Sequence, residues 1–142
     1  MHSRFRTVSF FLFLTISDFY LIFFCFFFRM KGGELEEYIG DCGRITEQEA
    51  REFLKQILSA LTHLHSLSIV HLDLKPENIL LVEANSIHVK LIDFGISRKF
   101  SNGTDIKGVY GTPEFIAPEI LNYEPIGFAT DLWSVGCIAF TL

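Results

Sequence analysis

The chain has 142 residues, a formal net charge of -5 and an isoelectric point near 5.5. This length is sufficient for one domain and no more. The acidic balance argues against a nucleic-acid partner, which would require a basic face. The three cysteines are Cys25, Cys42 and Cys137, and their spacing is typical neither of a disulfide framework nor of a metal site. So small and odd a number indicates a reducing compartment, and we expect a cytoplasmic or nuclear location.

The first 30 residues form a segment whose composition differs from that of the rest of the chain. Ten of the sixteen phenylalanines lie within residues 1–28, and residues 8–28 are almost uniformly apolar. Residues 8–28 are long enough to cross a bilayer as a helix, which takes about 20 residues. Asp18 lies in the middle of this stretch, where a charge costs on the order of 3 kcal/mol on insertion. Basic residues on both sides leave the orientation of such an anchor open.

A membrane anchor is therefore one interpretation of residues 8–28, but it is not the favoured one. Their monotonous Phe, Leu and Ile content resembles translated non-coding sequence joined to a coding exon, and we favour this second interpretation. A cleaved signal peptide fits poorly because no small-residue cleavage site follows the apolar run. We therefore treat residues 1–30 as separate from a domain that covers residues 31–142.

An amphipathic helix is predicted near the middle of the chain. Thr46 and Glu49 form a capping box, in which the threonine hydroxyl caps a backbone N–H group and the glutamate reaches back. Apolar residues then recur at three-four spacing as far as Leu64, which predicts a helix of about twenty residues ending near His65. His63 and His65 lie two residues apart and face different sides, so we expect packing and helix-dipole roles for them rather than metal binding.

Short strands follow this helix in the predicted order of elements. Residues 68–70 form the first strand, and residues 79–82 and 88–92 form a β-hairpin. A last apolar helix covers residues 132–142. No internal repeat is visible, so the chain is not a repeat protein.

Between the first strand and the hairpin lies the segment His-Leu-Asp-Leu-Lys-Pro-Glu-Asn, residues 71–78, with three functional side chains within six residues. Asp73 provides a carboxylate, Lys75 an ammonium group and Asn78 an amide. Asp93, in the sequence Asp-Phe-Gly, adds a second carboxylate directly after the hairpin. This combination is suited to the transfer of a phosphoryl group from a magnesium nucleotide to a hydroxyl group.

Each of these side chains has its own role in such a transfer. Asp73 accepts the proton of the acceptor hydroxyl, and Lys75 neutralises the charge of the transferred phosphate. Asn78 and Asp93 provide the oxygen ligands that Mg²⁺ prefers. A single Asp-Phe-Gly would be weak evidence, but a third block, Gly-Thr-Pro-Glu-Phe-Ile-Ala-Pro-Glu, follows at residues 111–119.

In this order and spacing, the three blocks resemble the middle of a eukaryotic Ser/Thr protein kinase domain, from about Lys31 to the end of the chain. The sequence of residues 71–78 is similar to that of the calmodulin-dependent kinase group. Residues 117–126 and 129–134 most resemble the death-associated protein kinase branch. The resemblance implies an α+β fold, mainly α, that comprises the C-lobe with its catalytic-loop hairpin and lacks the N-lobe.

The resemblance also implies which residues bind ATP. Glu34, where the hinge would lead into a short helix over residues 34–39, contacts the ribose or serves as a helix N-terminal acid, and both roles can hold together. Leu80 forms the apolar floor under adenine, although an ordinary core residue of a strand would look the same. Glu77 is a further candidate for nucleotide binding. The resemblance adds a third interpretation of residues 22–28, as the apolar strand that precedes the hinge.

Four more residues receive roles from the resemblance. Thr112 hydrogen-bonds the catalytic acid and lysine, which favours a Ser/Thr acceptor over Tyr. Asp131, at the head of the last helix, ties down the catalytic-loop backbone, with a plain N-cap as the alternative. His71 and Phe94 form the lower part of a hydrophobic stack.

One departure from the family pattern bears on regulation. Leu72 stands where the family usually has an arginine before the catalytic acid, so there is no guanidinium to bind a phosphate on the activation loop. We therefore expect that phosphorylation of Ser97, Ser101 or Thr104 is not required to order this loop.

The sequence thus predicts a Ser/Thr protein kinase domain fragment, with ATP and Mg²⁺ as cofactors and a protein as the second substrate. No Gly-rich phosphate loop and no suitably placed nucleotide-anchoring lysine precede Asp73, so we expect doubtful activity for this chain by itself. The alternatives are a non-catalytic fragment that acts as a binding module and a truncated product without a stable fold. A membrane location through residues 8–28 remains the minority interpretation.

Overall fold

The computed structural model describes residues 31–84, 86–100 and 105–142. The expectations for the Phe-rich segment, and those for Ser101 and Thr104, lie outside these residues. Within them, helices are connected by short antiparallel strands and by loops. The predicted α+β class with mainly helical content is confirmed.

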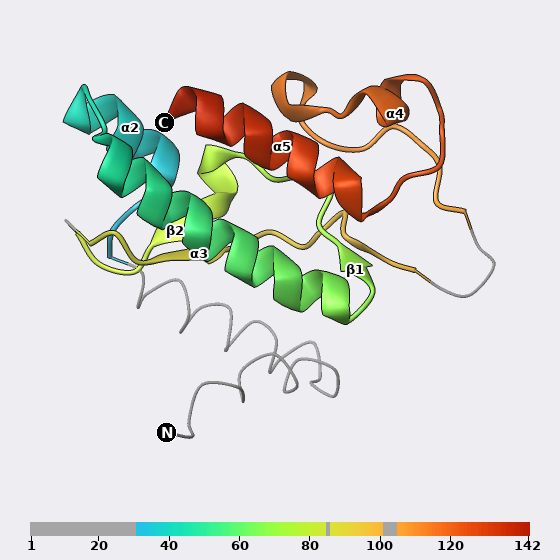
Figure 1. Cartoon of the computed structure of the whole chain (residues 1–142), viewed down its shortest axis with the longest axis horizontal. Coiled ribbons are helices and arrows are strands. Elements are labelled where there is room, and N and C mark those ends of the chain that lie inside the picture. The colour runs from blue at the N-terminus through green and yellow to red at the C-terminus, as the bar shows by residue number, and fades with distance from the viewer. Residues whose placement is uncertain (1–30, 85, 101–104) are drawn as a thin grey trace.

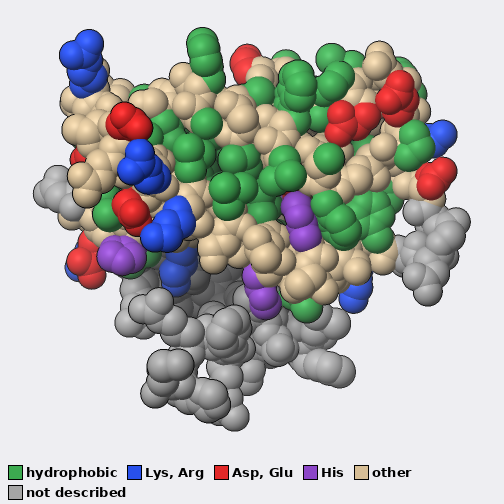
Figure 2. Space-filling view, in the orientation of Figure 1, with side chains coloured by type: hydrophobic (Ala, Val, Ile, Leu, Met, Phe, Trp, Pro, Cys, Tyr) green, Lys and Arg blue, Asp and Glu red, His purple; other side chains and the backbone are tan. Residues whose placement is uncertain are grey.

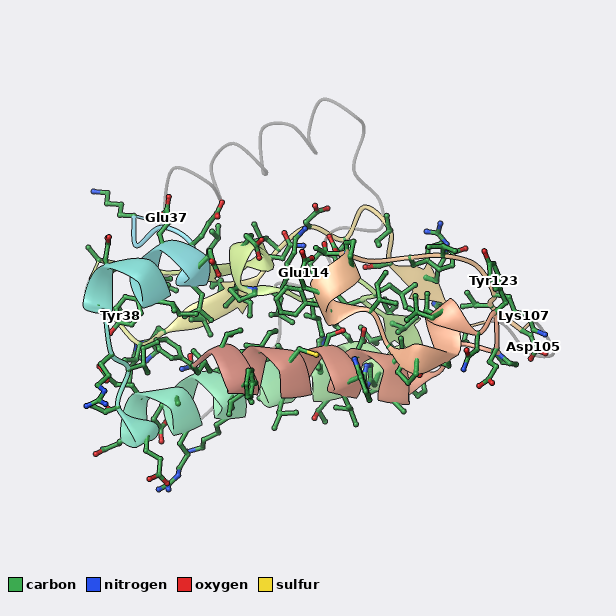
Figure 3. All side chains as sticks on the ribbon, turned by 90° about the horizontal axis from the view of Figure 1, so that it is seen from above. Glu37, Tyr38, Asp105, Lys107, Glu114 and Tyr123 are labelled. Atoms are coloured by element: carbon green, nitrogen blue, oxygen red, sulfur yellow. The ribbon has the colours of Figure 1, made fainter. Side chains whose placement is uncertain are left out.

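Two long helices form the main layer of the molecule. Helix α3 (Glu47–Ser66) and helix α5 (Phe128–Thr141) lie side by side, with strands β1 and β2 behind them in Figure 1. Helix α2 (Leu35–Cys42) lies at one end of this layer and helix α4 (Pro118–Leu121) lies toward the other. Figure 3 shows the same long axis, with Glu37 and Tyr38 at the α2 end and Lys107 and Tyr123 at the opposite end.

Helix α3 begins and ends close to where its sequence predicts. The N–H group of Glu49 donates to Oγ1 of Thr46 at 3.2 Å, and the N–H group of Thr46 donates to Oε2 of Glu49 at 2.9 Å. This is the predicted capping box. The hydroxyl of Thr46 also donates to the Glu49 carboxylate, and these bonds lower the pKa of Glu49.

The strands form two small antiparallel sheets. Strand β2 (Ile79–Leu81) pairs with β3 (Val89–Leu91), with Leu80 opposite Lys90, which is the predicted hairpin with shorter strands. Strand β1 (Ile69–Val70) pairs with β4 (Arg98–Lys99), which the sequence analysis missed. The β1–β4 pair anchors the chain on both sides of the catalytic segment.

Helix α5 begins earlier than predicted. Its N-cap is Gly127, whose N–H group donates to Oγ1 of Thr130 at 3.2 Å. Thr130 and Asp131 therefore lie in the first turns of the helix and are both buried, so the N-cap interpretation of Asp131 is wrong. The prediction failed because it took the start of the apolar run for the start of the helix.

The core has two parts. The larger apolar cluster joins α2, α3, the hairpin and α5, and the smaller one lies beneath the catalytic loop. The larger cluster contains Leu35, Phe53, Ile57, Leu61, Leu64, Leu74, Ile79, Leu81, Val135 and Ile138. The smaller cluster contains Val70, Leu72, Ile120 and Ile126.

The outer face of α5 is apolar and exposed. Leu132 and Trp133 are each 50% exposed and Phe140 is 92% exposed. Figure 2 shows hydrophobic side chains gathered over this part of the surface. Among the described residues, no helix combines the length and hydropathy needed to span a membrane.

Candidate active site

One buried carboxylate ties the backbone of the catalytic loop to helix α5. Asp131 is 1% exposed, and its Oδ2 and Oδ1 accept hydrogen bonds from the backbone N–H groups of His71 and Leu72, both at 2.9 Å. Nε2 of His65 lies 2.8 Å from Oδ2 of the same carboxylate. Asp131 thus makes the expected tie to the loop, and its three hydrogen-bond partners offset the cost of burying the carboxylate.

The proposed catalytic acid, lysine and threonine are joined directly. Oγ1 of Thr112 donates to Oδ1 of Asp73 at 2.8 Å and accepts from Nζ of Lys75 at 2.8 Å. Nζ of Lys75 also lies 3.4 Å from Oδ2 of Asp73. A hydroxyl has one proton to donate and lone pairs to accept with, so Thr112 can make both bonds at once. These are the contacts expected from the sequence.

Asn78 is buried, and two contacts turn its amide nitrogen toward the catalytic acid. Nδ2 donates to the backbone oxygen of Asp73 at 2.8 Å and to its Oδ2 at 3.0 Å. Because both contacts use the nitrogen, the amide oxygen is left for another ligand. An amide oxygen is a ligand that Mg²⁺ accepts, so the arrangement fits the predicted metal role.

Asp93 is set apart from this network. Its side chain is exposed, its φ is 58°, and Oδ1 accepts a hydrogen bond from the N–H group of Gly95 at 3.1 Å. Within the described part of the chain, its carboxylate has no hydrogen bond to the other predicted site residues. Its neighbour Ile92 donates from its N–H group to the backbone oxygen of Asn78 at 3.0 Å. The backbone therefore brings the segments of the two proposed metal ligands together, and Oδ2 of Asp93 has no hydrogen bond among the described residues.

His71 connects the catalytic loop to the segment that leads to Asp93. Its Nε2 lies 3.0 Å from the carbonyl oxygen of Ile92, and its Nδ1 lies 3.3 Å from the backbone nitrogen of Asp73. The neutral tautomer with the proton on Nε2 satisfies both contacts. Burial lowers the pKa of His71, against the opposing effect of the Asp131 carboxylate. The ring also packs on Phe94, at 4.9 Å between centroids, as expected for the stack.

The predicted adenine and ribose contacts lie on one paired segment. Glu34 directly precedes α2 and forms an isolated antiparallel bridge with Leu80. Leu80 is buried, and strand alternation places it on the face opposite Ile79 and Leu81, which belong to the core. Both positions are compatible with nucleotide binding, and their roles remain predictions.

Glu77 has an unusual environment for a carboxylate. Its Oε2 is buried and lacks a hydrogen-bond partner among the described residues. Leaving a buried acceptor of this kind unpaired costs free energy, so a hydrogen-bond donor on a ligand would stabilise it. This is the observation that supports its predicted place in a binding site.

Gly111 brings the Thr112 segment against the catalytic loop. Its φ is 100°, and a Cβ atom at this position would lie 2.8 Å from the carbonyl oxygen of Leu72. Only glycine allows both this backbone conformation and this close approach. The hydrogen bonds of Thr112 to the loop depend on this contact.

Leu72, the departure from the family pattern, is a buried core residue. It has a φ of 71° and packs with Val70, Ile120 and Ile126. Several partly buried side chains of the following segment pack against the same cluster, namely Ile96, Phe100, Ile106, Tyr110 and Ile116. Apolar packing thus surrounds the position at which the family pattern has an arginine.

His65 has the expected packing role, but sequence reasoning missed its contact with Asp131. Besides its contact with Asp131, its ring lies 4.6 Å from the ring of Phe128, which in turn lies 4.9 Å from the ring of Phe100. The end of α3, the start of α5 and the chain after β4 are connected in this way. The separation of His65 from His63 by two residues did show that they face different sides, but not which one faces α5.

Comparison with known proteins agrees with this geometry. A family model described as "Protein kinase domain" matches residues 12–142. The chain belongs to the protein kinase family. The match begins inside the Phe-rich segment, and the predicted division of this kinase chain at residue 30 stays a prediction.

The branch assignment from the sequence is also confirmed. The kinase chain is 47% identical over 115 residues to "Death-associated protein kinase 2" of Mus musculus and of Homo sapiens, which covers 80% of this chain and 31% of each relative. It is 49% identical over 114 residues to "Titin homolog" of Caenorhabditis elegans, which covers 80% of this chain and 1% of that protein. The matched part is therefore about a third of the length of the death-associated relatives.

Proposed function

We propose that this chain provides the catalytic segment for transfer of the γ-phosphoryl group of ATP to a serine or threonine hydroxyl of a protein. The observation that supports it best is the hydroxyl of Thr112, which bridges the carboxylate of Asp73 and the ammonium group of Lys75. In a kinase these two groups meet the acceptor hydroxyl and the transferred phosphate.

The chemistry follows from the positions of these groups. The acceptor oxygen forms a bond to the γ-phosphorus, the bond from phosphorus to the ADP oxygen breaks, and the acceptor proton passes to the carboxylate of Asp73. Lys75 stabilises the negative charge on the transferred group. Magnesium, when bound, would neutralise the phosphate oxygens and would be held by Asn78 and Asp93. The preference for Ser/Thr over Tyr rests on the same threonine bridge.

A second candidate function, a non-catalytic binding module, is favoured by one observation. A hollow of about 540 Å³ on the outer side of α5 is lined mainly by apolar residues. Its lining includes Phe115, Leu132, Trp133 and Phe140. An exposed apolar surface of this kind often marks a site of protein contact.

Magnesium-dependent nucleotide binding and phosphotransfer by the purified chain distinguish these candidates. The kinase proposal requires ATP binding that depends on Mg²⁺, and any phosphotransfer to a serine peptide should be lost in Asp73→Asn. Asp105→Asn is a matched control, because Asp105 is exposed and lies outside the site. Folded protein that binds no nucleotide would contradict the kinase proposal and favour the binding module. Lack of a cooperative thermal transition would favour a truncated product without a stable fold.

A further inference from the structure

We propose that Gln56 is a positioning residue for Asp93: it clamps the free edge of strand β3 (Val89–Leu91) to helix α3, and so fixes the strand end from which the proposed magnesium ligand emerges. This inference rests on the proposed function, because it concerns the ability of that same site to bind the magnesium nucleotide. Gln56 lies on α3, far from the catalytic loop in the sequence.

The amide of Gln56 binds the strand at two places. Its Nε2 donates to the carbonyl oxygen of Ile87 at 2.7 Å, and its Oε1 accepts from the N–H group of Val89 at 3.2 Å. Nε2 also donates to the carbonyl oxygen of Glu52, one turn earlier in its own helix, at 3.1 Å. These partners fix the orientation of the amide, because the nitrogen faces only acceptors and the oxygen faces a donor.

The two backbone groups held by Gln56 point away from the partner strand. On the other edge of β3, His88 accepts from the N–H group of Val82 and Ile92 donates to Asn78, so the even-numbered residues face β2. In an antiparallel pair the intervening residues direct their N–H and C=O groups to the opposite edge. Among the described residues the sheet has two strands, so no described strand pairs with that edge. The side-chain amide of Gln56 takes the place that a neighbouring strand would occupy.

This clamp bears on the position of Asp93 because the strand is short. Asp93 follows β3 by two residues, and Ile92 between them is bound at its N–H group by Asn78 and at its carbonyl oxygen by His71. Besides its pairing with β2, strand β3 is thus held by Gln56 at its start and by the catalytic loop at its end. The carboxylate of Asp93 has only the N–H group of Gly95 as a hydrogen-bond partner among the described residues, so its placement depends on the backbone. Groups that hydrogen-bond a metal ligand directly typically change metal affinity 10- to 100-fold when removed, and because Gln56 acts through the backbone we take the low end of this range.

Two variants of Gln56 and one control on the same helix test the proposal in the full chain. Gln56→Met keeps the length of the side chain and removes both bonds to the strand. Gln56→Glu keeps an acceptor for Val89 but places a carboxylate oxygen against the carbonyl oxygens of Ile87 and Glu52, so it should weaken the clamp at least as much as the methionine does. Gln48→Met makes the same chemical change at an exposed position in the first turn of α3. A cooperative thermal transition in each variant shows that it is folded.

Two measurements are made on each variant. The first is hydrogen exchange of the backbone amides of residues 89–93 without any ligand. The second is the Mg²⁺ concentration that gives half-maximal binding of a non-hydrolysable ATP analogue. We expect Gln56→Met to exchange faster at these amides and to need about tenfold more Mg²⁺, with Gln56→Glu affected at least as strongly and Gln48→Met unchanged.

The outcomes separate this inference from the proposed function. Faster exchange with an unchanged Mg²⁺ requirement would overturn the inference and leave Gln56 with a structural role. Unchanged exchange would overturn it as well. A wild-type chain that binds no magnesium nucleotide would contradict the proposed function, and the exchange measurement would still decide whether Gln56 positions the end of the strand.

Discussion

The catalytic loop and the segment around Asp93 belong to the same candidate site, but the protein holds them in different ways. In the loop, a buried carboxylate on α5 binds the backbone, and Asp73 is in contact with Lys75, Asn78 and Thr112. Asp93 is exposed and is placed by the backbone of its neighbours. The acceptor side of the proposed reaction is therefore arranged by the protein itself, whereas the carboxylate on the metal side is left for its ligand.

The largest expected effect comes from a variant that disrupts the catalytic loop, the better ordered of these two regions. Asp131→Asn replaces an acceptor of three hydrogen bonds with an amide whose nitrogen must face one of the donors. Because these groups are buried, we expect the free energy of unfolding to fall by about 3–5 kcal/mol. Urea denaturation measures the change, and Asp105→Asn, at an exposed site, should stay within about 0.5 kcal/mol of the wild type. A small loss in Asp131→Asn would show that the loop does not depend on this carboxylate.

A second variant separates the loop from the Thr112 segment. In Gly111→Ala the new methyl group meets the carbonyl oxygen of Leu72, and alanine must adopt a φ of 100°. Strain of this kind costs about 1–3 kcal/mol, and we expect the Thr112 bridge to be lost with it. Thermal unfolding and phosphotransfer are measured together.

The control for this variant is another glycine-to-alanine change. Gly40 lies within α2 and has no neighbouring atom that a Cβ would meet. Alanine is the better helix former, so Gly40→Ala should be neutral or stabilise the chain by up to about 1 kcal/mol. Equal effects of the two changes would argue against a special role for Gly111.

Acidification should loosen the connection between the two halves of the site. Burial lowers the pKa of His71, so the folded chain binds this proton less readily than the unfolded chain does. The stability that the neutral ring provides is therefore complete above its ordinary value of 6.5 and is lost as the pH falls toward the lower folded value. Protonation of Nδ1 would also remove the acceptor for the N–H group of Asp73.

Unfolding free energies measured between pH 7.5 and 5.5 test this expectation. His71→Gln should reduce the loss of stability on acidification, whereas His88→Gln, at an exposed position of the hairpin, should leave it unchanged. The same pH dependence in the wild type and in His71→Gln would rule out this histidine as its cause.

The smallest expected effect concerns the chain that follows Asp93. Alanine at Ser101 and Thr104 should change phosphotransfer less than twofold, because Leu72 and its apolar neighbours occupy the place of a phosphate-binding arginine. Ser97→Ala additionally removes a bond from Oγ to the carbonyl oxygen of His71 at 3.1 Å, so a modest loss of stability is expected there. Loss of activity in all three variants, with folding intact, would show that phosphorylation orders this segment.

Local sequence signals predicted the elements that depend on local interactions. The capping box at Thr46 and the apolar spacing after it predicted helix α3, and the alternation around the turn predicted the hairpin. The candidate catalytic residues were identified because the chemistry proposed for them is encoded in short motifs. In each of these cases the interacting groups lie within a few residues of one another.

The features that sequence reasoning missed depend on pairing across the fold. Strand β4 has two residues, and its partner β1 lies more than 25 residues earlier in the chain. The contact of His65 with Asp131 spans 66 residues, and that of Gln56 with Ile87 spans 31. A polar residue on a helix face shows no such partner in its local pattern, so only the folded chain identifies it.

The central proposal, that Asn78 and Asp93 provide the ligands of a metal site beside Asp73, is tested most directly with a paramagnetic probe. Mn²⁺ and a non-hydrolysable ATP analogue are added to the isotopically labelled chain, and the broadening of side-chain and backbone NMR signals is recorded. The account predicts that signals of Asn78 and Asp93 broaden first and together, and that Asp93→Asn weakens the effect at both. Broadening at only one of the two residues, or first at distant acidic residues such as Glu36 and Glu47, would contradict it.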